Sequence, residues 1–322
     1  MKSPLMFVLI FATNFIIPAF SQQNLQKSGQ QKVVRINPVK PDTNNPNRKA
    51  LNKFSKDNMF NVAPPSKVLK PEEVKAVNFY SEGSKKGKAG DYPGAILEFT
   101  KSLDLVKNVN TYLLRGYAYL MSGNYGAAIQ DETEALRLQE SLPKSYFIRG
   151  IARFETGDYK GAKSDFDIYL DRDRTNAIAF NYMAALCYMN QDFKGALENY
   201  NEVVRLDPKY PDIYTNRGMM RHHNQDYKGA IQDYNEALKQ NPDNVTAYNN
   251  RGAANIMLKD LQSALKDFNK AISINPKYAD AYDNRGRVKQ ALGDLTGACD
   301  DWNSAYINGL IASRDLILKF CK

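Results

Sequence analysis

The sequence is poor in the residues that most often carry chemistry: its 322 residues include only 2 histidines and 3 cysteines. The histidines, His222 and His223, are adjacent. On a helix their side chains would diverge by about 100° and could not bind one ion together. No further histidine or cysteine stands at metal-ligand spacing, so a metal site is not expected. There is also no phosphate-binding glycine loop and no serine-hydrolase or zinc signature. These absences predict a protein without catalytic residues or cofactor, and not an enzyme.

Long apolar runs are also missing, except at the N-terminus. The segment from Leu5 to Phe20 is mainly apolar, follows the basic Lys2, and ends in Ala19-Phe20-Ser21. This order is typical of a signal peptide with a small-x-small cleavage site. The run is shorter than the about 20 residues of a usual membrane span. We therefore expect residues 1–21 to be a cleaved signal peptide. The protein would then be exported, to the periplasm or the extracellular space, and would have no transmembrane segment after cleavage. A retained signal anchor is the alternative.

Excess basic charge is confined to the N-terminal part of the chain. Residues 1–70 contain 11 Lys and Arg and 2 Asp and Glu, whereas residues 71–322 contain 33 of each kind. Residues 22–70 are rich in Pro, Asn, Gln and Lys without a sustained hydrophobic period, which predicts a disordered tether. Its charge would permit weak contact with an anionic surface, although a plain solvated linker is the simpler interpretation. We expect no nucleic-acid partner.

An internal repeat dominates the remainder. A small residue recurs at intervals of 33 and then 34 residues: Gly83, Gly116, Gly150, Ala184, Gly218, Gly252 and Gly286. An aromatic residue stands four positions before each of these, and an alanine stands twelve positions after each. The residue sixteen positions later is aromatic in every unit except the second, where Glu132 takes the place.

At these positions the sequence resembles the tetratricopeptide-repeat family, of an exported bacterial type. The resemblance implies an all-α fold: a right-handed α-solenoid of about seven helix-turn-helix repeats in residues 71–309, capped by a short helix at 310–322. The expected repeats are 76–108, 109–142, 143–176, 177–210, 211–244, 245–278 and 279–309. A single helical hairpin cannot bury its apolar face alone, so stacking of the repeats is obligatory.

One side-chain pairing follows from comparing the repeats. Arginine precedes the small residue in five units, and an aspartate stands sixteen residues after each arginine. These pairs are Arg115/Asp131, Arg149/Asp165, Arg217/Asp233, Arg251/Asp267 and Arg285/Asp301. In unit 4 both positions change together, to Met183 and Asn199. A semi-buried guanidinium needs a carboxylate, so we predict an Arg–Asp bridge between helices, within or between units.

Two of the cysteines flank the last predicted turn, at Asn308-Gly309. An antiparallel hairpin there would bring Cys299 and Cys321 near each other, and an oxidising compartment would favour a disulfide between them. Two unpaired buried thiols are the alternative. Cys187 is expected to be a buried free thiol.

The family resemblance also implies a working surface, because the first helices of such repeats line a concave groove that binds extended peptides. In units 2 to 4 the expected groove is apolar, with Leu113, Leu114, Tyr117, Phe147 and Tyr182. In units 5 to 7 it is polar, with Asn216, Asn249, Asn250, Asn284 and Arg287. Asn216, Asn250 and Asn284 recur every 34 residues, and a row of amides can both donate to and accept from a peptide backbone. The alternatives are that these asparagines only match a common repeat consensus and that some apolar residues are interhelix core.

These features predict a non-enzymatic protein-interaction scaffold. It would bind an extended peptide or partner protein of unknown identity, in envelope assembly or secretion. The alternative is a structural subunit that self-associates, or packs permanently into a complex, through the apolar groove.

Overall fold

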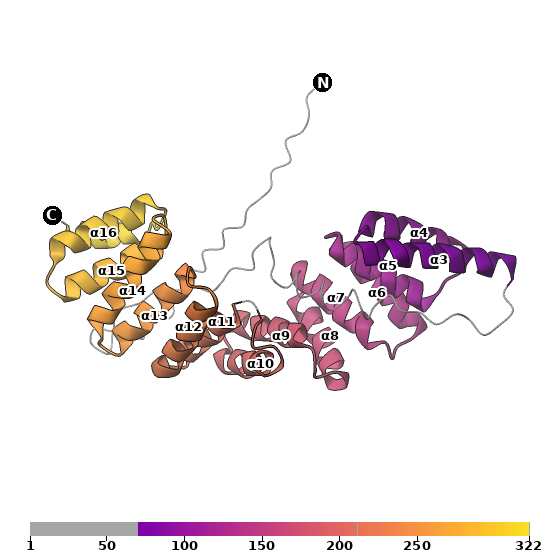
Figure 1. Cartoon of the computed structure of the whole chain (residues 1–322), viewed down its shortest axis with the longest axis horizontal. Helices are drawn as coiled ribbons and strands as arrows, with labels where there is room; N and C mark the ends of the chain where they lie inside the picture. Colours follow the sequence, from indigo (N-terminus) through magenta and orange to yellow (C-terminus); the bar gives the residue numbers. More distant parts are fainter. Residues whose placement is uncertain (1–69, 211, 322) are drawn as a thin grey trace, which may run out of the picture. The chain divides into compact units, whose positions relative to one another are not determined.

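The computed structural model describes residues 70–210 and 212–321, and within them it contains fifteen α-helices and no strand. Consecutive helices pack in pairs, so that seven hairpins follow one another in chain order and one further helix packs on the last (Figure 1). This confirms the all-α repeat architecture. The predicted signal peptide and residues 22–69 of the predicted tether lie outside the described residues. None of the described helices has the length and apolar character needed to cross a bilayer.

We number the hairpins units 1 to 7. Units 1 to 3 comprise α3 (Pro71–Ala89) and α4 (Tyr92–Leu105), α5 (Val109–Met121) and α6 (Tyr125–Leu138), and α7 (Pro143–Glu155) and α8 (Tyr159–Arg172). Units 4 and 5 comprise α9 (Ala177–Met189) and α10 (Phe193–Leu206), and α11 (Ile213–His223) and α12 (Tyr227–Gln240). Units 6 and 7 comprise α13 (Val245–Met257) and α14 (Leu261–Ile274), and α15 (Ala279–Ala291) and α16 (Leu295–Ile307), followed by α17 (Ser313–Phe320).

The chain reverses within each unit by means of two adjacent residues. The first has a positive φ, and these residues are Gly90, Gly123, Gly157, Gln191, Gln225, Lys259 and Gly293. The second caps the second helix: Asp91, Asn124, Asp158, Asp192, Asp226, Asp260 and Asp294. Its side-chain oxygen accepts a hydrogen bond from the backbone N–H three residues later, for example at 2.9 Å between Asp226 and Gly229. Such a cap stabilises a helix by about 1 kcal/mol.

The recurring small residue allows the two helices of a unit to approach closely. A Cβ atom placed on Gly252 of α13 would lie 2.7 Å from Cε1 of Phe268 on α14, a distance that a side chain cannot occupy. The ring of Phe268 therefore packs directly on helix backbone and is fully buried. Gly150 and Phe166 repeat this arrangement, which explains why small and aromatic residues recur together.

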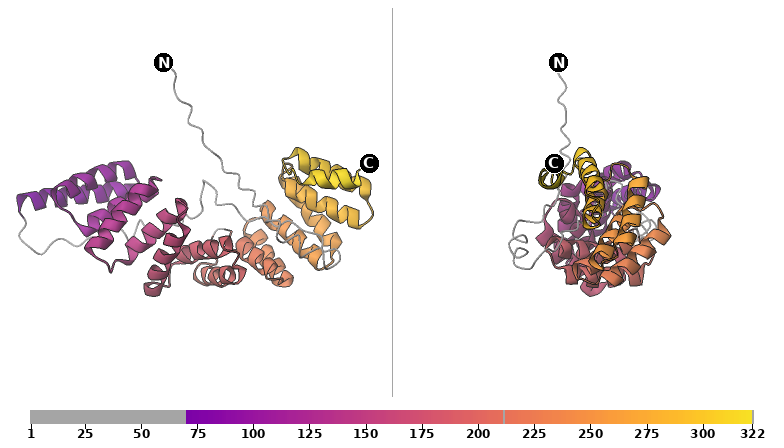
Figure 2. Two further views of the ribbon diagram at one scale, coloured as in Figure 1. Left: turned by 180° about the vertical axis from the view of Figure 1, so that it is seen from behind. Right: turned by 90° about the vertical axis from the view of Figure 1, so that its left-hand side faces the viewer.

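Neighbouring units pack mainly through the second helix of one and the first helix of the next, and the left view of Figure 2 shows the hairpins following one another in chain order. First helices also contact one another in the pairs α3–α5, α5–α7, α11–α13 and α13–α15. The junction between α8 and α9 is the least extensive of the six between units.

The bounds of the first repeat and of the last helix differ from the approximate ones that the sequence suggested. The expected first repeat starts at residue 76, but α3 begins at Pro71. Proline suits the first helical position because its missing N–H would have no helical partner there. The backbone N–H of Lys70 donates to Oε2 of Glu73 at 2.7 Å and caps this start. At the other end, α17 covers only part of the expected 310–322 segment.

Candidate functional site

The described residues contain no group of three or more His, Cys, Asp or Glu that could hold a metal ion. His222 is buried and packs edge-on against Tyr227, with ring centroids 4.9 Å apart. Burial lowers the pKa of His222 to about 3. His223 stacks on Phe193 at 4.2 Å, and burial lowers the pKa of His223 too. Both imidazoles are thus aromatic packing partners that stay neutral near pH 7.

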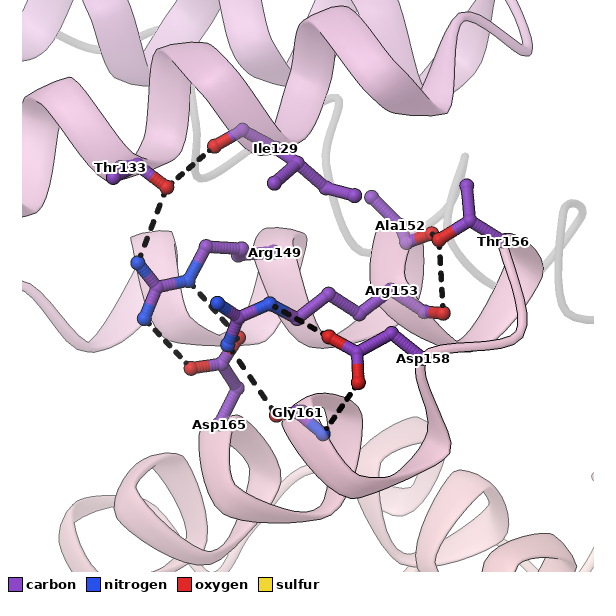
Figure 3. A network of polar contacts seen from close by, with 9 residues as sticks. All are labelled: Ile129, Thr133, Arg149, Ala152, Arg153, Thr156, Asp158, Gly161 and Asp165. Carbon is purple, nitrogen blue, oxygen red and sulfur yellow. Dashed lines mark hydrogen bonds and ion pairs between the residues drawn. The ribbon is translucent and has the colours of Figure 1, made fainter.

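The predicted Arg–Asp bridges are confirmed, and all five form within a unit. In unit 3, Nε and Nη2 of Arg149 donate to the two carboxylate oxygens of Asp165 at 3.0 and 2.8 Å (Figure 3). Arg153, one turn later, adds a second cation to Asp165 at 2.7 Å. The Arg149 guanidinium carbon lies 5.6 Å from the ring centroid of Tyr146. These arginines are therefore committed to the scaffold and are poor candidates for contacting a partner.

The apolar side chains expected to line a groove lie instead in the hydrophobic core. All five are at most 6% exposed: Leu113, Leu114, Tyr117, Phe147 and Tyr182. They belong to one continuous cluster that runs from unit 1 into unit 5. Tyr182 of α9, for example, stacks on Phe166 of α8 with centroids 5.4 Å apart. The expectation of an open apolar groove is corrected accordingly, because these side chains fill the space between helices.

The asparagines expected to line the polar half of the groove differ in burial. Asn249, Asn250 and Asn284 are fully buried, whereas Asn216 is half-buried. Nδ2 of Asn249 donates to Oδ1 of Asn250 at 3.2 Å, and Nδ2 of Asn284 donates to Oδ1 of Asn249 at 3.0 Å. The second bond joins α15 to α13. The structure thus brings three of the predicted amides together in a linked row on adjacent first helices.

Arg287 is not the available groove cation that the sequence suggested. Its Nε donates to Oδ2 of Asp283 at 2.7 Å, one turn earlier on α15. The other oxygen of Asp283 accepts a hydrogen bond from the Ser313 hydroxyl at 2.8 Å. Asp283 and Ser313 are both fully buried. Arg287 and Asp283 therefore help to attach α17 to the last unit, a role that needed the position of α17 to be known.

Glu132 is a buried carboxyl group whose environment the sequence did not reveal. It occupies the position of the packed aromatic ring in unit 2, beside Gly116, and is fully buried. Neither carboxylate oxygen has a hydrogen-bond partner of normal geometry among the described residues. Burial raises the pKa of Glu132 well above its usual range, and the nearby Ser145 hydroxyl opposes that shift only partly. The missing aromatic at this position was the one sequence signal for an unusual core.

The C-terminal cap is covalently attached. A disulfide joins Cys299 of α16 to Cys321, immediately after α17. Phe320 then packs on Trp302 with ring centroids 5.7 Å apart. Cys187 is a free thiol in α9, partly rather than fully buried, and burial raises the pKa of its thiol.

Comparison with known proteins places these features in a family context. A repeat model described as "TPR repeat" matches residues 184–223 and 218–259, and one described as "Tetratricopeptide repeat" matches residues 245–278. No curated protein matches the chain.

Several solved structures share the fold. The C-terminal part of a TPR repeat-containing protein from Cytophaga hutchinsonii aligns with a TM-score of 0.58 at 18% identity, covering 71% of this chain and 95% of that one. A tetratricopeptide repeat protein from Parabacteroides merdae aligns with a TM-score of 0.52 at 16% identity, covering 77% and 100%. YrrB, described as a TPR protein with an unusual peptide-binding site, aligns with a TM-score of 0.54 at 22% identity, covering 57% and 95%. At these identities the likeness establishes a shared fold, and together with the repeat matches it supports a tetratricopeptide-repeat protein.

Proposed function

We propose that this chain, with the repeats and fold of a tetratricopeptide-repeat protein, is a non-enzymatic scaffold that binds an extended segment of a partner polypeptide. Tetratricopeptide-repeat proteins generally mediate protein–protein interactions. The binding surface we propose is the row of first-helix amides in units 5 to 7, with Asn216, its half-buried member, as the accessible contact and the fully buried Asn250 and Asn284 behind it. The observation that carries this assignment is that Asn216, Asn250 and Asn284 recur at one position on three adjacent first helices.

The chemistry of the row suits a peptide backbone. An amide side chain both donates and accepts, so asparagines one repeat apart can each pair with a peptide group of the same extended segment without reading side chains. Asn249 links Asn250 to Asn284 by hydrogen bonds, which holds the amides in fixed orientations. Pre-organised groups lose less side-chain entropy when they bind. The peptide-binding site named for YrrB is consistent with this use of the fold.

The apolar residues of units 2 to 4 suit this role less well. Leu114 and Tyr182 are 1% and 2% exposed, whereas Asn216 is half-buried and presents part of its amide to a partner. Self-association through an apolar groove is for the same reason the weaker candidate.

Capture of a partner by the full chain would test the proposal. We expect Asn216→Ala and Asn250→Ala to lose a partner that the parent retains. Asn303→Ala is the matched control, because Asn303 is an exposed amide on a second helix, α16. Since Asn250 is buried, thermal unfolding must show that its variant is folded, and Asn216→Ala gives the cleaner readout. Loss of the partner with Asn303→Ala alone would place the site on the second-helix surface and overturn the proposal.

We further propose that the scaffold works outside the cytoplasm, in envelope assembly or secretion. The disulfide between Cys299 and Cys321 supports this, because such bonds persist mainly in oxidising compartments. Cell fractionation, with mass measurement of the exported form, tests it. We expect a mature protein that begins at Gln22, and a cytoplasmic full-length protein with reduced cysteines would refute the idea.

A further inference from the structure

Five of the six joints between units share the same polar bridge. The arginine that pairs with aspartate inside its own unit also uses Nη1 to reach a polar side chain on the second helix of the preceding unit. The bridges are Arg115–Thr100 at 3.0 Å, Arg149–Thr133 at 3.3 Å, Arg217–Asn201 at 3.3 Å, Arg251–Asn235 at 2.6 Å and Arg285–Asn269 at 2.6 Å. Figure 3 shows Arg149 between Thr133 and Asp165. Each guanidinium therefore joins three helices from two units.

The joint between units 3 and 4 lacks this bridge. The arginine position holds Met183, which is buried, and the facing position on α8 holds Asp167. Asp167 pairs instead with Lys163 on its own helix at 2.8 Å. Asn199, in the place of the aspartate, donates to the backbone oxygen of Gly195 at 2.8 Å. Over residues 70–210 and 212–321, this is the one joint without an arginine bridge.

Packing at this joint is reduced as well. The contact between α8 and α9 is the least extensive of the six between units. The backbone of α9 also approaches neither α7 nor α11 as closely as first helices approach one another in units 1 to 3 and 5 to 7. Two separate features, a missing polar bridge and a smaller helix contact, therefore coincide at the same place.

The joint keeps a buried aromatic contact and one long hydrogen bond, from the Tyr182 hydroxyl to Oε1 of Glu155 at 3.4 Å. Tyr182 of α9 stacks on Phe166 of α8, with ring planes 16° apart, and meets the edge of Phe154 on α7 at 5.0 Å. Both Tyr182 and Phe166 are at most 2% exposed. The bridging side chains at the other joints, such as Thr133 and Asn235, are by contrast exposed. The unit 3–4 joint is thus packed at its buried side, but it has no arginine bridge at its solvent side.

We propose that the repeat array bends at the α8–α9 joint, with the Phe166–Tyr182 stack as pivot and units 1–3 and 4–7 as the two moving bodies. A stacked ring pair permits a change of angle without loss of apolar burial, whereas the directed Nη1 hydrogen bond at the other joints is lost when its angle or length changes. Hinge motions of this kind use a few residues between rigid bodies. Bending at this joint would set the relative orientation of the two bodies, whatever partner the array binds.

Distance measurements between spin labels on the full chain would test the hinge. A Cys187→Ser background removes the free thiol, and the measurements are made without reductant so that the Cys299–Cys321 disulfide stays closed. One label pair, at Ser164 and Glu198, spans the unit 3–4 joint, and the reference pair, at Gln232 and Lys266, spans the bridged unit 5–6 joint. All four positions are exposed and are equivalent by the repeat.

We expect a broader distance distribution for the first pair than for the reference pair. Met183→Arg with Asn199→Asp builds the missing bridge and should narrow the first distribution to the reference width. Arg251→Met with Asp267→Asn copies unit 4 into unit 6 and should broaden the reference pair. If Met183→Arg with Asn199→Asp does not fold, the hinge is still tested by whether Arg251→Met with Asp267→Asn broadens the distance distribution of the reference pair. Equal widths in the parent, or no broadening with the unit 6 change, would overturn the proposal.

Discussion

Arg251 and Asp267 face each other across unit 6 with two parallel hydrogen bonds, Nε to Oδ2 at 2.9 Å and Nη2 to Oδ1 at 2.6 Å. The same pair of contacts closes four other units. The Arg251 guanidinium carbon also lies 5.4 Å from the ring centroid of Tyr248. A two-bond arginine–carboxylate pair combines strength with a defined geometry. Its repetition holds the two helices of five units in the same arrangement.

Breaking this pair from either side should cost more than replacing both partners. Arg251→Met or Asp267→Asn alone leaves a largely buried charge without its counter-ion, and we expect each to lower the free energy of unfolding by about 2 to 4 kcal/mol. The double variant reproduces unit 4 and should cost about 1 to 3 kcal/mol less than the sum of the singles. Denaturant unfolding of all four proteins measures this. The exposed pair Arg137–Glu134 is the control, where we expect less than about 1 kcal/mol, and additive singles at unit 6 would disprove the coupling.

Stability should fall as pH rises above about 4.5 because of Glu132. Its folded-state pKa is raised by burial, so the protonated carboxyl is the form that the core accepts. The stabilisation is complete below the unfolded-state pKa of about 4.5 and is lost as pH rises toward the raised folded-state value. Glu132→Gln removes the titration and should be increasingly more stable than the parent as pH rises. Unfolding curves from pH 4.5 to 8 test this, and parallel pH profiles would contradict it.

Stability should also fall at acidic pH, because His222 is buried in its neutral form. With the pKa of His222 lowered to about 3, folding favours the neutral ring. Stability from this residue is constant above the unfolded-state pKa of about 6.5 and declines as pH falls from there toward 3. The ring proton resonances of His222 should not titrate between pH 5 and 8. In His222→Asn the decline in stability below pH 6.5 should be smaller than in the parent, and a normal titration of His222 near 6.5 would refute the buried neutral state.

Reducing the disulfide should loosen the C-terminal cap. The bond closes a loop between residues 22 positions apart, and its removal should destabilise the last unit by about 3 kcal/mol. Trp302, the only tryptophan of the chain, is fully buried against Phe320. We therefore expect its fluorescence to shift to longer wavelength in Cys321→Ser or in reductant. Cys187→Ser should leave the spectrum unchanged, and an unshifted spectrum after reduction would show that α17 packs without the bond.

The turns of units 4 to 6 carry a small conformational strain. Gln225 has a φ of 65°, in the left-handed region. The equivalent turns of units 1, 2, 3 and 7 have glycine at this position. Gln225→Gly should stabilise the protein by about 0.5 kcal/mol, because the steric cost slightly exceeds the entropy cost of glycine. Gly157→Ala, at the equivalent turn with a φ of 85°, should destabilise it by about 1 kcal/mol. Thermal unfolding of both variants checks the opposite signs.

The sequence by itself determined the repeat architecture and its internal bridges, because both follow from spacing. A period of 34 residues places the same residue in the same environment in each unit, so Arg251 and Asp267 could be paired from comparison alone. The paired change to Met183 and Asn199 in unit 4 pointed to the same contact. Local rules of this kind act over one hairpin and need no knowledge of the rest of the chain.

Tertiary structure decided which of the repeating side chains are accessible. Tyr182 and Leu114 lie on first helices, but the neighbouring helices bury them, and burial depends on packing that no single position encodes. Arg287 seemed available until α17 brought Ser313 to the far side of Asp283, thirty residues away along the chain. The α8–α9 joint likewise became visible only once helix contacts could be compared. The spacing of residues along the chain predicts which positions are equivalent in each unit. The exposure of a side chain and the extent of contact between units depend on how the units pack against one another.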